Sequence, residues 1–170
     1  MSVDPAPAQQ AYNHSARHIA AHAEAGRRVA ILCQGDPLFY GSFSYLFDRL
    51  AERFAIEIVP GVSSMHAAGA ACQLPLVGRN DALSVLPAPL PEDLLLQRLR
   101  EGGAAVIIKL GRHFEKVSRV LALTGRLETA RYIERATLAS ERILPLHKVE
   151  PERVPYFSII LAPAPSRRTG

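Results

Sequence analysis

A Gly-Asp-Pro turn is the part of this sequence whose residue types are best suited to chemistry. It lies in QGDPLFYGS, between an apolar run at 28–33 and a stretch of helical periodicity that begins at Asp36. Gly35 allows a ligand to approach the backbone, and the Asp36 carboxylate can accept hydrogen bonds from ligand hydroxyl or amino groups. Ligands of open α/β sheets bind where strands end and helices begin. An Asp-Pro pair is also common at helix starts, so this turn alone favours a helix cap over a ligand site.

Two further turns follow apolar runs in the same way. PGVSS at 60–64 offers Ser63 and Ser64 as donors to a ligand carboxylate, although serine at a helix start is more often a cap. KLGR at 109–112 places Gly111 where a ligand could lie against the backbone. Neither GxxxxGK[ST] nor GxGxxG occurs in the 170 residues, which disfavours ordinary nucleoside-triphosphate and dinucleotide sites.

The elements that must position these turns alternate along the chain. Helical periodicity predicts helices at 12–25, from Asp36 to about 54, at 63–72, from Pro91 past Leu99, and at 113–124. Short apolar runs predict strands at 28–33, 56–59, 83–86, 104–109 and 131–135, and two last strands, near 142–149 and 156–161, with no helix between them. This order predicts an α/β chain that ends in antiparallel strands. A polar connector at 78–81 suggests domains at 1–78 and 79–163, with a disordered tail at 164–170.

Composition narrows the class of protein. The net charge of +4 favours an anionic partner, but the basic residues are scattered among few aromatics and no nucleic-acid motif occurs, so a small acidic ligand fits better than nucleic acid. No apolar run approaches the roughly 18 residues of a membrane span, and the opening lacks the pattern of a secretory signal. We therefore expect a cytoplasmic protein in which Cys33 and Cys72 are reduced thiols.

Three histidines share one helical spacing. His14, His18 and His22 fall at i, i+4 and i+8, a geometry that can bind a metal ion. No cysteine or carboxylate is obviously placed as a further ligand, and histidines are common on the solvent face of helices. We expect no metal site here.

Six segments, taken in order, resemble the tetrapyrrole methylase family and its precorrin-2 C(20)-methyltransferase branch. They are QGDPLFYGSFSYLFDRL, VPGVSS with QLPL, IIKLGR, YIERAT and VPYFSIIL. The resemblance implies two α/β domains with a cofactor cleft between them, and a homodimer. It also implies S-adenosylmethionine as cofactor and methyl transfer to the C(20) meso carbon of precorrin-2, which gives precorrin-3A in cobalamin biosynthesis.

The same resemblance implies the site residues. The first domain would contribute Gln34, Gly35, Asp36, Phe39, Ser63 and Ser64 to the cofactor site, and the second would contribute Leu110, Gly111, Ala136 and Thr137. Around the proposed site, the groups suited to the acidic substrate are Tyr40, Arg79, Arg112 and Arg135. The group that accepts the proton released from the methylated carbon is left open among Tyr40, Glu134 and His113, which qualify by chemistry alone.

The amino end departs from the family pattern. Family members begin with a strand and a loop of the GxGPGDP kind, and nothing in MSVDPAPAQQAYNHS matches it, so we expect a truncated first domain. Two alternatives therefore stay open beside C(20) methylation of precorrin-2. One is a sibling methylase that acts on another ring position or on a cobalt-loaded substrate, and the other is an inactive fragment that serves only as a dimerising module.

Overall fold

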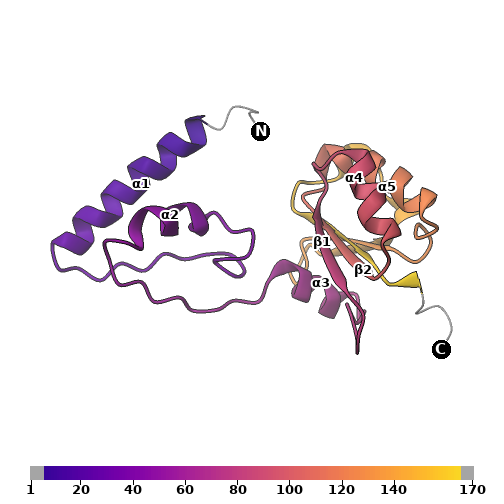
Figure 1. Cartoon of the computed structure of the whole chain (residues 1–170), viewed down its shortest axis with the longest axis horizontal. Coiled ribbons are helices and arrows are strands. Elements are labelled where there is room, and N and C mark those ends of the chain that lie inside the picture. Colours follow the sequence, from indigo (N-terminus) through magenta and orange to yellow (C-terminus); the bar gives the residue numbers. More distant parts are fainter. Residues whose placement is uncertain (1–5, 166–170) are drawn as a thin grey trace. The chain divides into compact units, whose positions relative to one another are not determined.

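The computed structural model describes residues 6–165, which form two compact units, one up to Ser63 and one from Ser64 onward (Figure 1). The division falls earlier than the predicted boundary near Gly78. The reason is that Ala68, Leu74 and Leu76 pack against the sheet of the second unit. Of the expected tail, Ala164 is buried, and residues 166–170 lie outside the described range.

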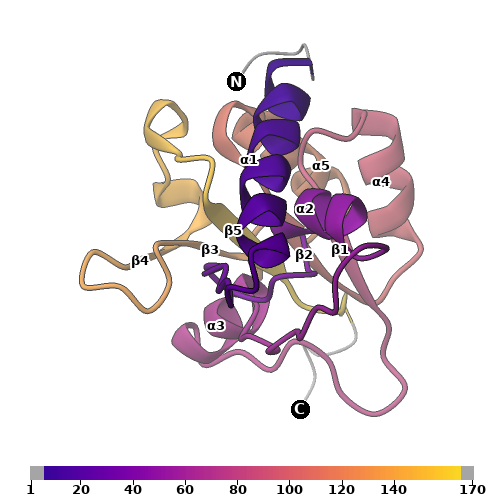
Figure 2. The same cartoon turned by 90° about the vertical axis from the view of Figure 1, so that its left-hand side faces the viewer.

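A five-stranded sheet organises the second unit. Its strands are β1 (Leu83–Pro87), β2 (Ala104–Ile108), β3 (Arg131–Glu134), β4 (Arg142–Pro145) and β5 (Ser158–Ala162). They are ordered β1-β2-β5-β3-β4, as Figure 2 shows from one side. The β1–β2 pair is parallel, and the three other pairings are antiparallel. The predicted α/β chain that ends in antiparallel strands is therefore confirmed in this unit.

Helices cover both faces of this sheet, and alternate residues of each strand meet them. On one face, Ile107 and Ile160 join the main core with α4 (Glu92–Arg100) and α5 (Phe114–Leu123). On the other face, Val106 and Ile159 pack with α3 (Ser64–Ala71). Because both faces are covered, all five residues of β2 are buried, as expected for the apolar run AAVII.

Short 3-10 helices connect the elements of the second unit. They span Gly111–His113 (η1), Leu146–Lys148 (η2) and Pro151–Arg153 (η3). The last predicted strands are shorter than expected, because Pro145 ends β4 and the chain turns into η2. The other predicted strands and helices of this unit are confirmed to within a few residues.

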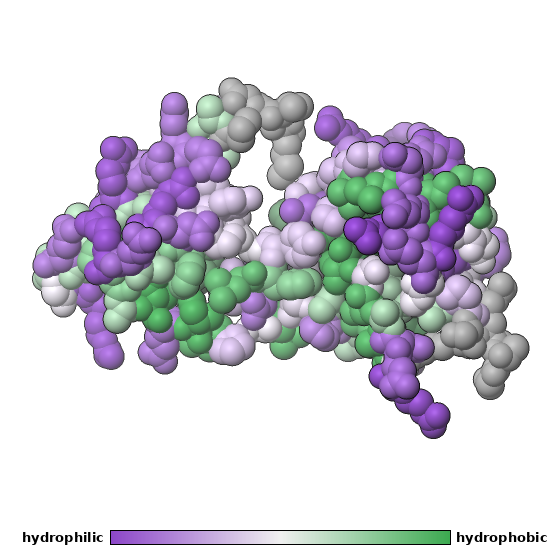
Figure 3. Space-filling model, in the orientation of Figure 1, coloured by the Kyte–Doolittle hydropathy of each residue, from purple (hydrophilic) through white to green (hydrophobic). Residues whose placement is uncertain are grey.

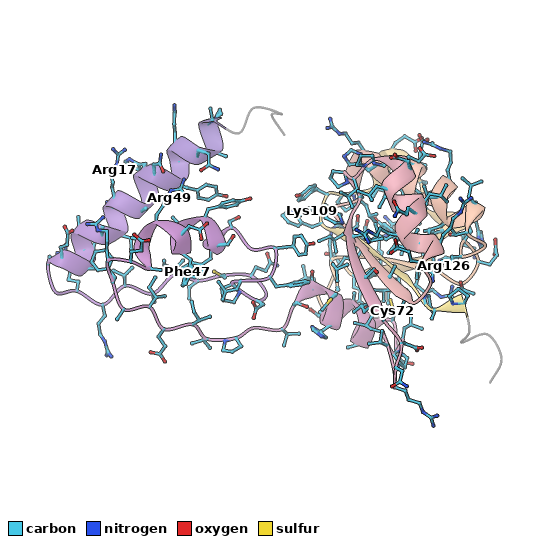
Figure 4. All side chains as sticks on the ribbon, viewed as in Figure 1. Arg17, Phe47, Arg49, Cys72, Lys109 and Arg126 are labelled. Atoms are coloured by element: carbon cyan, nitrogen blue, oxygen red, sulfur yellow. The ribbon has the colours of Figure 1, made fainter. Side chains whose placement is uncertain are left out.

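The first unit is built on two helices, α1 (Ala6–Glu24) and α2 (Phe43–Leu50), which lie side by side (Figure 1). Their contact buries Ala16 and Ala20 of α1 with Leu50 of α2. The guanidinium of Arg49, labelled in Figure 4, donates hydrogen bonds to the side-chain oxygens of Asn13 (2.7 Å) and Gln9 (2.6 Å). Small residues on α1 thus allow close packing, and Arg49 ties the two helices together.

The strands predicted at 28–33 and 56–59 are wrong. Both segments are irregular, and among the described residues of the first unit no strand occurs. Leu32 is 95% exposed and Val59 is 74% exposed, and Figure 3 shows apolar side chains gathered on the surface of this unit over its extended segments. A strand exists only where its backbone groups pair with a neighbour, and neither segment has one in the described chain.

The helix predicted from Asp36 is also wrong at its start. The α2 helix begins at Phe43, and Asp36 does not cap it. The Leu38 N–H donates to Oδ1 of Asp36 at 3.0 Å, which makes a local turn in place of a helix start. The backbone of Tyr40 then adopts a φ of 54°, in the left-handed region, and interrupts the helical path.

Candidate functional site

Asp36 joins two of the predicted turns within the first unit. Besides the bond from Leu38, its Oδ2 accepts a hydrogen bond from the Gly61 N–H at 3.1 Å. These backbone donors, Gly61 first and Leu38 second, hold the pKa of the Asp36 carboxyl below its usual value. The Gly-Asp-Pro turn and the Pro60-Gly61 turn therefore lie against each other, and an ionised carboxylate links them.

Gly61 is required by this close approach. A Cβ at Gly61 would lie 2.4 Å from the carbonyl oxygen of Gly35, closer than real Cβ atoms come. Gly35 itself has a φ of +83°, and the nearest atom to a Cβ there is the Val62 carbonyl oxygen at 3.6 Å. The contact with Gly61 was missed from the sequence, although a glycine directly after Pro60 is a signal for such an approach.

The remaining predicted residues of the first unit differ in exposure. Gln34 is exposed, while Phe39 is half-buried and meets the Tyr40 ring edge-on, with centroids 5.1 Å apart. Tyr40 is 50% exposed. Ser63 is buried at the end of this unit, and Ser64 is exposed at the first position of α3 in the next.

In the second unit, strand pairing brings the predicted turn at 109–112 and the segment with Ala136 and Thr137 to the same end of the strands. β5 lies between β2 and β3 and is antiparallel to both, so β2 and β3 run in the same direction. Ile108 and Ile133, near the ends of β2 and β3, both pair with Ile159. The turns at 109–111 and 135–137 therefore leave the sheet side by side, on either side of the start of β5.

The turn at 109–111 has a glycine, Gly111, whose backbone carries no side chain. Leu110 is fully buried, and Gly111 has a φ of +41°, with its N–H donating to the Pro155 carbonyl at 3.3 Å. A Cβ at Gly111 would lie 3.5 Å from the Cα of Tyr156. Arg112 follows on the exposed side of η1. The turn thus offers a ligand a glycine backbone beside a cationic side chain.

The second turn is closed by its own hydrogen bonds. Thr137 has a φ of 67°, its N–H donates to Oε2 of Glu141 at 2.6 Å, and its hydroxyl donates to the Ala136 carbonyl at 2.6 Å. Ala136 is half-buried and packs on the α3 face of the sheet. Glu141, which was not singled out from the sequence, fixes the shape of this turn.

A buried carboxylate lies beneath the second turn. Glu134 has a side chain only 1% exposed, accepts a hydrogen bond from the Tyr132 hydroxyl at 2.5 Å, and forms ion pairs with Arg142 (3.3 Å) and Arg135 (3.6 Å). Burial, and then the bond to Glu134, raise the pKa of Tyr132, which keeps its hydroxyl a donor. Glu134 is thus held by three partners and orients two arginines whose side chains are each 47% exposed.

Two other predicted residues are placed differently. Burial, followed by the charges of Lys116 and Arg112, lowers the pKa of His113, so this imidazole is neutral at pH 7 and can accept a proton. His113 belongs to η1, beside Gly111.

Arg79 lies in the turn that leads into β1, at the opposite end of the parallel strands from the turns at 109–111 and 135–137. The structure does not bring Arg79 to them.

Comparison with known proteins identifies the family of this chain. The family model described as "Tetrapyrrole (Corrin/Porphyrin) Methylases" matches residues 1–149. The chain belongs to the tetrapyrrole methylase family.

Curated relatives within the tetrapyrrole methylases carry related names. A precorrin-2 C(20)-methyltransferase of Sinorhizobium sp is 47% identical over 152 residues, covering 89% of this chain and 62% of the relative. A cobalt-precorrin-2 C(20)-methyltransferase of Salmonella typhimurium is 34% identical over 163 residues, covering 95% of this chain and 69% of the relative. This chain therefore spans about six-tenths of the length of the Sinorhizobium relative.

Solved tetrapyrrole methylases share the fold. The methyltransferase CobJ matches with a TM-score of 0.69 at 26% identity, over 91% of this chain and 72% of that chain. A uroporphyrin-III C-methyltransferase from Thermus thermophilus, solved in complex with S-adenyl homocysteine, matches with a TM-score of 0.66 at 26% identity, over 88% and 72%. In residues 6–165, no group of three or more His, Cys, Asp or Glu side chains could hold a metal ion, and no helix is long and apolar enough to cross a membrane.

Proposed function

We propose that this chain transfers a methyl group from S-adenosylmethionine to C(20) of precorrin-2, giving precorrin-3A and S-adenosylhomocysteine. The observation that carries the proposal is the 47% identity with a precorrin-2 C(20)-methyltransferase over 152 residues. We also propose that the protein is a homodimer and works in the cytoplasm, as the family resemblance implies.

The residues of this chain fit S-adenosylmethionine. That cofactor supplies a methyl group already activated on a sulfonium, so the protein must hold and align the reactants and exclude water. Gly35 and Gly111 both have positive φ, and a Cβ at either would make only ordinary van der Waals contacts within the chain, so the backbone conformation and not crowding favours glycine there. The cofactor would lie against the backbone at both glycines. In the first unit, Gln34, Phe39 and Ser63 would accompany Gly35 and Asp36; in the second, Ser64, Leu110, Ala136 and Thr137 would accompany Gly111.

The acceptor is a polycarboxylate, and arginines beside the turns of the second unit suit it. Arg112 is exposed next to Gly111. Arg135 and Arg142 are partly exposed, and each forms an ion pair with the buried Glu134. Guanidinium groups held in this way bind carboxylates through paired hydrogen bonds. Tyr40 remains a proposed substrate contact, whereas Arg79 does not, because it lies at the opposite end of the parallel strands. His113, neutral at pH 7, is the proposed acceptor of the proton that leaves the methylated carbon.

A second candidate is methylation of the cobalt-loaded substrate. The 34% identity with the Salmonella cobalt-precorrin-2 enzyme favours it, but the higher identity with the Sinorhizobium protein favours the metal-free substrate. Parallel reactions with precorrin-2 and cobalt-precorrin-2 separate the two candidates.

The test uses the full chain with S-adenosylmethionine and precorrin-2. We expect a product heavier by one methyl group, with NMR placing that methyl at C(20), and calorimetry should detect S-adenosylhomocysteine binding. Binding without turnover would argue for an inactive module. A methyl group at another ring carbon would assign the chain to a sibling reaction, and the absence of both binding and turnover would refute the proposal.

A further inference from the structure

The histidines of α1 form a close pair. His18 and His22 are four residues apart, so helix geometry places them on neighbouring turns of the same face. Their Nε2 atoms lie 3.3 Å apart, and their rings meet edge-on with centroids 4.8 Å apart. Two ring nitrogens of the kind that bind metals therefore lie close together on the exposed side of the helix.

The separation matches shared coordination of one ion. Zinc binds imidazole nitrogen at about 2.0–2.1 Å. Two such bonds to nitrogens 3.3 Å apart enclose an angle of about 108°, close to that of a tetrahedron. A hydrogen bond between the rings uses the same atoms, but 3.3 Å is longer than the usual distance for N–H donors. The separation therefore suits two bonds to one metal ion as well as a hydrogen bond between the rings.

Although the sequence alone predicted no metal site on this helix, the close approach of the two rings leads us to propose that His18 and His22 bind a divalent transition-metal ion, Zn²⁺, Ni²⁺ or Cu²⁺, with water completing its coordination. These ions prefer imidazole ligands, and Cu²⁺ binds most tightly in the usual order of affinities. This site is independent of the proposed methyl transfer.

The pair is accessible from solvent. Ala16 and Ala20 face the α2 helix and are buried, whereas His18 is exposed and His22 is half-buried. The nearest acidic residue on the helix after His22, Glu24, is paired with Arg53 at 2.5 Å. The carboxylate is therefore engaged elsewhere, and the two imidazoles are the protein ligands of the site.

Binding should strengthen α1. An ion held by residues four apart links consecutive turns and opposes fraying of the helix. A ligand that binds only the folded state also raises stability by mass action. Metal binding should therefore raise the temperature at which α1 unfolds and slow amide hydrogen exchange in its last turns.

The test is calorimetry of the full chain, without a histidine tag, titrated with Zn²⁺, and EPR after addition of Cu²⁺. We expect one ion per chain and nitrogen coupling in the EPR spectrum. His18→Gln and His22→Gln should each weaken binding about tenfold or more, which is about 1.4 kcal/mol or more. Glutamine keeps helix propensity, and far-UV circular dichroism will confirm that both variants fold.

Two controls make the result decisive. His14→Gln changes a histidine on the same helix, and His147→Gln changes an exposed one in η2; both should keep the affinity of the unaltered chain. The proposal is overturned if no saturable binding occurs at millimolar Zn²⁺ or Cu²⁺. It is equally overturned if His18→Gln binds as tightly as the unaltered chain, or if either control weakens binding as much as His22→Gln does.

Discussion

Replacing Gly111 with alanine tests whether a ligand lies against the backbone after β2. The φ of Gly111 is +41°, a conformation that costs an L-residue about 1–2 kcal/mol. Alanine also lowers the conformational entropy of the unfolded chain, which offsets about 0.4–1 kcal/mol of this cost. The new methyl group itself meets only atoms of Tyr156, the nearest being its Cα at 3.5 Å, which is an ordinary contact. The net loss in stability should be about 1 kcal/mol, or a fall in Tm of about 4 °C.

Gly125 provides a matched control for this change. It has a φ of +67°, follows α5, and a Cβ there would have no neighbour within 4 Å. Gly125→Ala should therefore cost about the same stability as Gly111→Ala, since both introduce the same backbone strain. Only Gly111→Ala should affect the proposed cofactor site.

The assay is calorimetric titration of both variants with S-adenosylhomocysteine at a temperature well below either Tm. A methyl group in the path of a ligand that contacts Gly111 should weaken binding about tenfold, or about 1.4 kcal/mol. Gly125→Ala should bind as the unaltered chain does. Equal affinities for all three proteins would refute the placement of the ligand at Gly111, and equal losses in both variants would mean that strain alone, and not contact, lowers the affinity.

Three further outcomes are expected. Glu134→Gln should destabilise the second unit by about 1 kcal/mol in urea unfolding, because the half-exposed arginines lose a charged partner while Tyr132 keeps an acceptor; a more stable variant would contradict this. Asp36→Asn should be less stable than the unaltered chain at pH 7. The pKa of Asp36 is lowered from 3.8 by hydrogen bonds from Gly61 and Leu38, so the stability difference between the two proteins should vanish as the pH falls through the pKa of Asp36 in the folded state. A stability difference that persists in acid would contradict this role of the Asp36 carboxylate. The imidazole of His113 should titrate below pH 6.5 by NMR because its pKa is lowered, and stability should fall as the pH drops below 6.5, a dependence that His113→Gln removes.

The secondary structure of the second unit could be predicted well from the sequence, because its local sequence patterns agree with the tertiary packing of the same residues. The run at 104–108 is apolar without interruption and proves to be buried on both faces. Leu95 and Leu99 recur at helical spacing and face the core of the sheet. In these elements the local pattern and the tertiary partner favour the same structure.

The first unit shows where such patterns fail. Residues 28–33 have the composition of a buried strand, but strand formation depends on a partner that composition cannot supply. Phe39, Phe43 and Phe47 follow helical spacing, yet the turn at Asp36 and the left-handed Tyr40 delay the helix until Phe43. Periodicity describes which side a residue faces and does not mark where a helix starts.

Part of the candidate site depended on long-range pairing. The turns around Gly35 and Gly111 could be predicted, because glycine after an apolar run is a local signal. Arg142 could not, since its role follows from the register that places it opposite Glu134 across β3 and β4. The contact of Gly61 with Asp36 likewise joins residues 25 positions apart.

The central position of β5 has a consequence for how the protein is made. The chain is synthesised from its amino end, so the β1–β2 pair and the β3–β4 pair both emerge before the strand that lies between them. Until β5 arrives, each pair has an open edge on which another chain could be captured. Completion of the sheet thus falls to β5, the last of its five strands to be translated, so the unfinished sheet should be most prone to pairing with another chain until β5 has been made.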